Sequence, residues 1–204
     1  SPFPRKLMAT KLTKLAAVNV VLSNVGQAPV TTIDNDNPMV VMAANVLDEV
    51  TNSVQSEGWT YNTERAYPFT PDTAKKIAIP ANVLQLDSSR TSRLDVVIRE
   101  GKLYNKRDHT YNFDDQVKAD VIWLVEFDDM PEAFKQYVTM RAANLYAGRA
   151  VGSSEAVRFG EREEAQARAA MLEYETEQGD YNFLGTEDNL NIPSYRPFDA
   201  AYRF

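Results

Sequence analysis

Few side chains in this sequence could perform acid–base or nucleophilic chemistry. There is one histidine, His109, and there is no cysteine. The missing cysteine excludes thiol nucleophiles, Cys-ligated zinc and iron–sulfur clusters. His109 lies in the polar stretch 106–110, and no G-x-S-x-G motif supplies a serine for it to activate. We therefore predict that His109 is a solvated loop residue, and one histidine cannot form a multi-histidine metal site.

Carboxylates are abundant, because the chain holds 29 Asp and Glu residues. Two carboxylates across a sugar ring could make the chain a hydrolase of surface polysaccharide or cell wall, which is one possible function. The candidate groups are Asp114 with Asp115, Glu126 with Asp128 and Asp129, and Glu163 with Glu164. The same groups also fit simpler roles. Asp114 and Asp115 fit a turn, and Asp128 and Asp129 fit negative charge at a helix N-terminus. We predict no catalytic residue and no enzyme.

Metal and phosphate motifs are incomplete. Asp108, Asp114 and Asp115 could offer oxygen ligands to Ca²⁺, but they lack the D-x-[DN]-x-[DN]-G pattern of a calcium loop. The glycines at 148–152 lack the Lys-Ser/Thr that ends a phosphate-binding loop. The sequence therefore predicts no metal site and no cofactor.

Charge is distributed unevenly along the chain. The formal net charge is −7, which argues against a broad surface that grips nucleic acid. Residues 1–30 hold four basic side chains and no acidic one, whereas residues 153–180 hold eight acidic and three basic ones. The acidic stretch is either a solvated helix face or a surface that faces DNA without holding it. Under the second interpretation, four acidic residues would face a channel through which DNA passes. They are Glu161, Glu163, Glu164 and Glu173.

Hydrophobic spacing predicts four helices that would position these side chains. The first runs from Thr10 to a stop at Gly26, and the second from the Asn37-Pro38 cap to Gly58. Each has a predicted apolar stripe, made of Leu12, Leu15, Val18, Leu22 and Val25 in the first helix and of Val40, Ala44, Leu47, Val50 and Val54 in the second. The third begins at Met130-Pro131-Glu132. The fourth follows Gly152 and ends before Gly179, with Gly160 as a possible kink. Its predicted buried residues are Phe159, Ala165, Ala169 and Leu172.

Between the helices, from about residue 66 to residue 127, the period changes to two. Val83, Leu84 and Leu86 predict one strand, and the alternation at 94–99 predicts another. Glu100-Gly101 predicts a two-residue hairpin turn into 102–104. The β-branched run 121–125 fits a strand covered on both faces. The prolines Pro68, Pro71 and Pro80 are expected at edges or turns.

These patterns predict an α+β fold, with an antiparallel bundle of about four helices and an inserted small antiparallel β-domain. The expected domains are residues 1–65 with 128–179 for the bundle, 66–127 for the insertion and 180–204 for an extended C-terminal tail. No apolar run is long enough to span a bilayer, and the first ten residues do not resemble a secretory signal. The tail is irregular but rich in aromatic residues, namely Tyr181, Phe183, Tyr195, Phe198, Tyr202 and Phe204.

Several stretches, in order and at consistent spacing, carry a resemblance to a known family. They are 17–30 (AVNVVLSNVGQAPV), 55–62 (QSEGWTYN), 99–104 (REGKLY) with 110–113 (TYNF), 130–134 (MPEAF) through 141–143, and 171–175 (MLEYE) before 179–182 (GDYN). The chain resembles tail tubular protein A, the head-to-tail adaptor or gatekeeper of short-tailed podovirus-type phages. The resemblance covers roughly residues 12–185, and the last 20 residues match nothing in it.

The resemblance implies a structural protein of the virion tail that is assembled in the host cytoplasm. Such adaptors form a dodecameric ring that joins the portal protein to the tail nozzle, tail tubular protein B. The ring continues the channel through which genomic DNA is ejected, without sequence-specific binding, and tail fibres dock near it. The implied partners are therefore further copies of the chain, the portal, the nozzle and the fibre, with no membrane. The six aromatic residues of the tail are candidate portal-binding residues.

Overall fold

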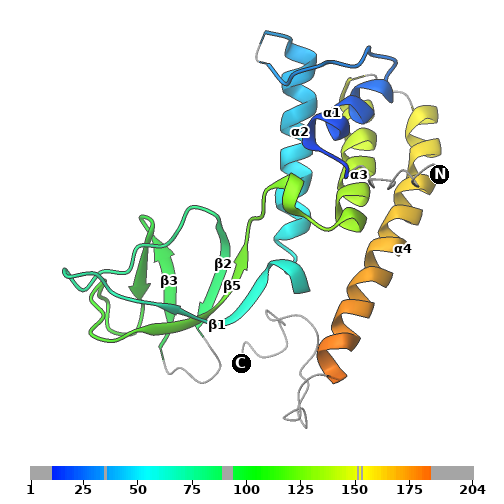
Figure 1. Cartoon of the computed structure of the whole chain (residues 1–204). Helices are drawn as coiled ribbons and strands as arrows, with labels where there is room; N and C mark the ends of the chain where they lie inside the picture. The colour runs from blue at the N-terminus through cyan, green and yellow to red at the C-terminus, as the bar shows by residue number, and fades with distance from the viewer. Residues whose placement is uncertain (1–10, 35, 89–93, 151, 153, 185–204) are drawn as a thin grey trace, which may run out of the picture. The chain divides into compact units, whose positions relative to one another are not determined.

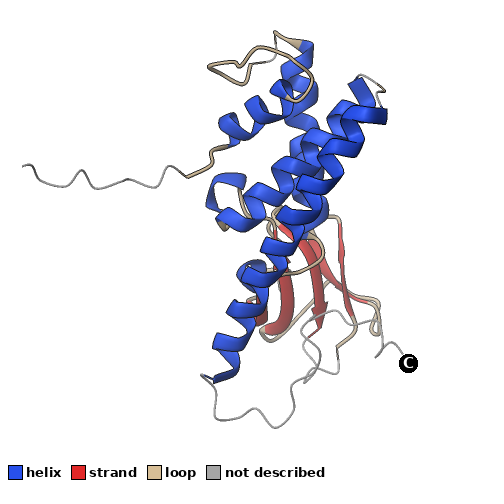
Figure 2. Cartoon of the chain, turned by 90° about the vertical axis from the view of Figure 1, so that its right-hand side faces the viewer, coloured by secondary structure: helices blue, strands red, loops and turns tan. Residues whose placement is uncertain are grey.

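The computed structural model describes residues 11–34, 36–88, 94–150, 152 and 154–184. In chain order, its elements are α1 (Lys14–Ser23), α2 (Pro38–Gln55), η1 (Thr60–Asn62), β1 (Thr63–Phe69), β2 (Val83–Ser88), β3 (Val96–Arg99), β4 (Lys102–Asn105), β5 (Val117–Trp123), η2 (Phe127–Asp129), α3 (Glu132–Ala150) and α4 (Ser154–Leu184), as drawn in Figure 1. Figure 2 distinguishes the helices from the strands by colour. The predicted α+β class, with four helices and small antiparallel sheets, is confirmed.

The chain divides into two compact units. One unit, which we call the helical unit, contains residues 1–50 and 126–171. The other, the β unit, contains residues 51–125 and 172–204. The backbone therefore passes between units inside α2, after Val125 and inside α4. The domain boundaries expected from the sequence remain a prediction.

In the helical unit, α1 packs against α3. Thr13 caps α1, because its Oγ1 accepts a hydrogen bond from the Ala16 N–H at 3.2 Å. Val18 and Leu22 are buried on α1, as the predicted stripe requires. On α3 the buried residues include Phe134 and Tyr137. The α1–α3 pair therefore forms the hydrophobic centre of this unit.

Helix α2 follows the sequence prediction closely. The Asn37 Oδ1 accepts the Met39 N–H at 3.0 Å, so Asn37 is the expected N-cap. All five residues of the predicted stripe are buried, namely Val40, Ala44, Leu47, Val50 and Val54. The helix ends at Gln55, before the predicted Gly58. Gly58 has φ +77°, and a Cβ there would lie 2.7 Å from the Ile122 Cδ1, so this position requires glycine.

The β unit contains a three-stranded antiparallel sheet in the order β1–β5–β2 and the separate hairpin β3–β4. The predicted strand at 121–125 overlaps β5, whose Val121 and Ile122 are fully buried at the centre of the sheet. Pro68 lies on the edge strand β1, as expected. The core residues are Phe69, Ile77, Val96, Leu103, Phe113, Val117, Ala119 and Val121.

The turn between β3 and β4 is the predicted one. Arg99 pairs with Lys102 in the ladder, and the two residues between them, Glu100 and Gly101, have φ values of +52° and +68°. Positive φ at both central positions is typical of a type I′ turn, which matches the twist of a hairpin. The sequence therefore determined the register of this hairpin.

Helix α4 differs from its prediction in two ways. It continues through Gly179 to Leu184, because a glycine inside a helix costs only about 1 kcal/mol and does not end it unless a cap follows. Three of its four predicted buried residues were also wrong, since Ala165, Ala169 and Leu172 are exposed, while the side chain of the fourth, Phe159, lies outside the described part. Between Gly160 and Gly179, the part of the helix whose burial is described, the buried residues are instead Met171 and Glu175.

Candidate functional site

Several of the carboxylates considered as candidates for catalysis have structural partners of their own. His109 is exposed in a turn, as expected. Asp114 is exposed and forms an ion pair with Lys75 at 2.6 Å. Asp128 accepts the Lys14 N–H at 2.7 Å in front of α1. Within the described ranges, no group of three or more His, Asp or Glu side chains is arranged to hold a metal ion.

The four acidic residues proposed for a channel do not share one face of α4. Glu161, Glu163 and Glu173 are exposed, whereas Glu164 is half-buried and accepts a hydrogen bond from the Asn144 Nδ2 at 2.8 Å. Successive residues on a helix are 100° apart, so Glu163 points away from Glu164. Ten residues separate Glu163 from Glu173, and this spacing returns the two side chains to within about 80° of each other.

Glu161 and Glu164 line a groove of about 470 Å³ in the helical unit, together with Arg141, Asn144, Leu145, Gly148 and Arg149. Two guanidinium groups thus share this groove with the two carboxylates. Arg149 also makes a bidentate pair with Glu49, at 2.7 and 2.9 Å, and this hydrogen bonding lowers the pKa of Glu49. The groove therefore holds basic as well as acidic side chains, and Arg149 is already paired with Glu49.

The contact between α3 and α4 depends on Gly160. A Cβ at this position would lie 1.8 Å from the Asn144 Oδ1. About two turns later, the Arg168 Nη1 donates to the Tyr137 hydroxyl at 2.8 Å, and the Arg141 Nη1 donates to the same oxygen at 2.9 Å. Gly160 therefore allows close packing of the two helices, and α4 continues through it as one helix in Figure 1.

Glu175 is an acidic residue that the sequence placed on the solvated face and the structure places in the interior. It is 2% exposed, and its Oε1 accepts the Thr60 N–H at 2.7 Å. The neighbouring Tyr61 has a raised pKa, first because of burial and second because of the negative charge of Glu175. The sequence could not predict that Glu175 is buried, because it is one of many acidic residues in this stretch and nothing in the pattern distinguishes it.

A polar network joins the end of α2 to the end of β5 within the β unit. The Gln55 Nε2 donates to the Val125 C=O at 2.8 Å, and the Gln55 Oε1 accepts the Val125 N–H at 2.9 Å. The Asn62 Nδ2 donates to the Gln55 and Trp123 carbonyls at 3.0 and 2.9 Å. The Trp59 indole N–H donates to the Val54 C=O. The start and the end of the strand-bearing segment are thus held together.

The portal-binding candidates lie at the end of the described chain or beyond it. Tyr181 and Phe183 belong to the last turn of α4 and not to an irregular tail. The other four candidates, Tyr195, Phe198, Tyr202 and Phe204, lie outside the described residues.

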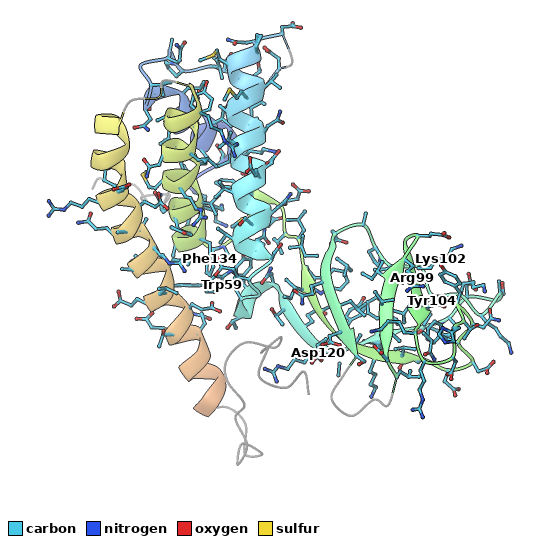
Figure 3. The ribbon with its side chains drawn as sticks, turned by 180° about the vertical axis from the view of Figure 1, so that it is seen from behind. Trp59, Arg99, Lys102, Tyr104, Asp120 and Phe134 are labelled. Carbon is cyan, nitrogen blue, oxygen red and sulfur yellow. The ribbon has the colours of Figure 1, made fainter. Side chains whose placement is uncertain are left out.

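Sequence reasoning assigned no role to the outer face of the β3–β4 hairpin, where Arg99, Lys102 and Tyr104 lie together (Figure 3). The Arg99 guanidinium lies 4.2 Å from the centre of the Tyr104 ring. The sequence could have predicted that Arg99 and Lys102 lie side by side, because residues that flank a two-residue turn must share one face of the hairpin.

None of the helices in the described residues is sufficiently long and apolar to cross a membrane. A family model described as "Tube: Tail tubular protein" matches residues 15–181. Tail tubular protein A of Klebsiella phage KP34 is 27% identical over 164 residues, which are 79% of this chain and 86% of that protein. These matches agree with the resemblance seen in the motifs, and they indicate a structural role in the phage tail. The chain belongs to the tail tubular protein family.

Proposed function

We propose that this protein is the head-to-tail adaptor of a short-tailed phage, and that it acts as a structural protein and not as an enzyme. Its copies would form a dodecameric ring between the portal protein and the tail nozzle, assembled in the host cytoplasm, with tail fibres docked nearby. The observation that carries the proposal is the family match over residues 15–181. The function needs no cofactor, because the ring only joins parts and holds a channel open.

The exposed carboxylates of α4 are proposed to face the DNA channel, although they lie around the helix and not on one side of it. Glu161, Glu163 and Glu173 are exposed. Carboxylates that line a passage repel the phosphate backbone, so that DNA slides without sticking. A ring would multiply the net charge of −7 per chain and strengthen this field. We expect little affinity of the isolated protein for duplex DNA at physiological salt.

The C-terminal aromatic residues are proposed as anchors on the portal. They comprise Tyr181, Phe183, Tyr195, Phe198, Tyr202 and Phe204. Burial of one such ring contributes roughly 1.5–3 kcal/mol of apolar transfer, less the cost of ordering the chain. Equivalent segments from every copy of a ring would add through avidity, so that weak single anchors give firm attachment.

The decisive experiment mixes the purified protein with its portal protein. Negative-stain electron microscopy should find a ring with a central channel beneath the portal, and mass photometry should give its copy number. A truncation after Leu184 serves as the matched variant, because it removes four aromatic residues and leaves every described element intact. The truncated protein should keep its melting temperature and fail to join the portal.

Two results would contradict the proposal. A protein that remains monomeric with the portal at micromolar concentration would refute the ring. Micromolar binding of duplex DNA with a steep salt dependence would refute the repelling channel, because such a slope reports contacts between Lys or Arg and phosphates.

A further inference from the structure

The outer face of the β3–β4 hairpin is a cationic and aromatic surface. The ladder pairs Val97 with Tyr104 and Arg99 with Lys102, so these four residues share the face opposite to the buried Leu103. Arg99 and Lys102 are both exposed. Figure 3 shows both side chains on this hairpin, beside Tyr104.

The side chains on this face are ordered by contacts with one another. The Arg99 guanidinium lies 4.2 Å from the centre of the Tyr104 ring, which meets the Tyr111 ring edge-on at 4.8 Å. The Lys76 Nζ lies 5.8 Å from the centre of the Tyr111 ring. A guanidinium stacked on a ring keeps its in-plane N–H groups available for a carboxylate. Because the stack already restricts the side chain, little further entropy is lost when a partner binds.

These cations lack the carboxylates that neighbouring cations have. Lys75 pairs with Asp114 at 2.6 Å and Lys106 pairs with Asp95 at 2.7 Å. In the described part of the chain, no carboxylate lies within ion-pair distance of Arg99 or Lys102. A protein with a net charge of −7 thus leaves two adjacent cations without counter-charges. This surface is complementary to an anionic partner.

Helix α4 carries a matching pair of carboxylates in the β unit. Glu173 and Glu177 are exposed and stand four residues apart, so they lie one above the other, about 6 Å apart along the helix axis. Arg99 and Lys102 stand directly opposite each other, with Cα atoms about 5 Å apart. Two cations can therefore face two carboxylates at nearly equal spacing. No ion pair among the described residues joins the hairpin to α4 within one chain.

We propose that the Arg99–Lys102 face of the hairpin docks on Glu173 and Glu177 of a second copy of this chain. Arg99 would grip one carboxylate through two parallel N–H bonds, and Lys102 would pair with the other as a point charge. The contact joins two different surfaces, so it propagates from copy to copy and closes into a ring when the rotation permits. This inference rests on the proposed ring, names the residues that would hold neighbouring copies together, and assigns Glu173 to that contact in place of the channel.

Charge reversal tests the contact through its symmetry. The variants R99E/K102E and E173K/E177K should each assemble at least about tenfold more weakly than the wild type, because like charges then meet at every contact. In an equimolar mixture, each reversed hairpin meets a reversed helix of the other variant, and alternate copies should assemble again. Arg65 and Lys118 are exposed on β1 and β5, and R65E/K118E is therefore the control with the same charge change. It should assemble like the wild type.

A cross-link tests proximity directly, because the chain contains no native cysteine. Single variants K102C and E177C, mixed and oxidised, should give a covalent dimer in higher yield than K118C with E177C. Circular dichroism of each variant verifies that it is folded.

The outcomes separate this inference from the adaptor function. If wild-type rings form and the charge-reversed variants assemble equally well, the inference is overturned and the adaptor function stands. If neither rings nor the K102C–E177C cross-link form, both are overturned. If R99E/K102E loses only affinity for short duplex DNA and still assembles, the face binds phosphates, and the proposed occupant is wrong.

Discussion

Gly160 offers the sharpest test of the packing between α3 and α4. In a solvent-exposed helix, replacing glycine by alanine stabilises by about 1 kcal/mol, because the unfolded chain loses freedom. At Gly160 the new Cβ would lie 1.8 Å from the Oδ1 and 2.7 Å from the Cγ of Asn144. Real Cβ contacts are not this short, so the Asn144 side chain must rotate away or the helices must separate.

Rotation of Asn144 breaks its hydrogen bond to Glu164, which is 2.8 Å long. A hydrogen bond to a charged group contributes roughly 1.5–3 kcal/mol, and displaced packing adds roughly 1–3 kcal/mol. After the propensity gain of about 1 kcal/mol is subtracted, Gly160→Ala should lower the free energy of unfolding by about 1.5–5 kcal/mol. In an Asn144→Ala background the clash is absent. The same substitution should then raise the free energy of unfolding by about 1 kcal/mol.

The assay is a double-mutant cycle from urea unfolding, followed by far-ultraviolet circular dichroism. The coupling between the two sites should be about 2.5–6 kcal/mol, and the sign of the Gly160→Ala effect should reverse between backgrounds. For a chain of this size, 1 kcal/mol corresponds to a shift in melting temperature of about 2–4 °C. A Gly160→Ala variant that is more stable than the wild type would refute the close approach of the two helices.

Three further predictions concern other buried groups. Lys135 is 1% exposed and pairs with Glu132 at 3.1 Å, so Glu132→Gln should lower the free energy of thermal unfolding by roughly 3 kcal/mol. The apolar Lys135→Met should stay within about 1 kcal/mol of the wild type. Equal stability of all three proteins would contradict this prediction. Gln55→Leu removes both hydrogen bonds to Val125 and should lower the free energy of unfolding, measured by urea titration, by about 2–3 kcal/mol. A loss below about 0.5 kcal/mol, which is typical of an ordinary surface substitution, would refute the network. Burial raises the pKa of Tyr61, so the folded state holds this proton when the unfolded state releases it near pH 10, and stability should fall as the pH rises above about 10. Tyr61→Phe should make that fall less steep in melting temperature against pH, and an unchanged slope would exclude Tyr61 as its source.

Local patterns predicted the parts of the fold that local physics determines. The Asn37 cap, the apolar stripe of α2 and the Glu100-Gly101 turn each depend on a few neighbouring residues, and each was predicted correctly. Strand β1 was not predicted as a separate element. Its Pro68 and a bulge between Glu64 and Tyr67 hide the alternation that marks a strand.

The buried face of α4 could not be predicted in the same way. Its burial depends on groups far away in the sequence, such as Tyr137 against Arg168 and the Thr60 N–H against Glu175. A buried Arg or Glu has the same sequence signature as a solvated one, because only its partner distinguishes the two. The acidic residues were therefore treated as one surface, although Glu164 and Glu175 have partners.

For the candidate site, the sequence supplied the family resemblance, and the comparison with known proteins confirmed the family. The sequence did not indicate which charged side chains lack a partner of opposite charge. Arg99 and Lys75 are both basic residues near a tyrosine-rich loop, and only the three-dimensional structure distinguishes the stacked Arg99 from the ion-paired Lys75. Whether a charged side chain has a partner depends on the distances between side chains in space. The spacing of residues along the sequence determines such distances only within one helix or one hairpin.

The hydrogen bond from the Asn62 Nδ2 to the Trp123 C=O has a consequence for how such a protein can change during evolution. Because 2.9 Å separates these atoms, residues 63–122 leave and rejoin the chain at one point. A segment with adjacent ends can be exchanged for another of different length without moving the helices that flank it. The segment could thus change in length among related proteins while α2 and α3 keep their own sequences, as long as the Arg99–Lys102 face of the hairpin is retained.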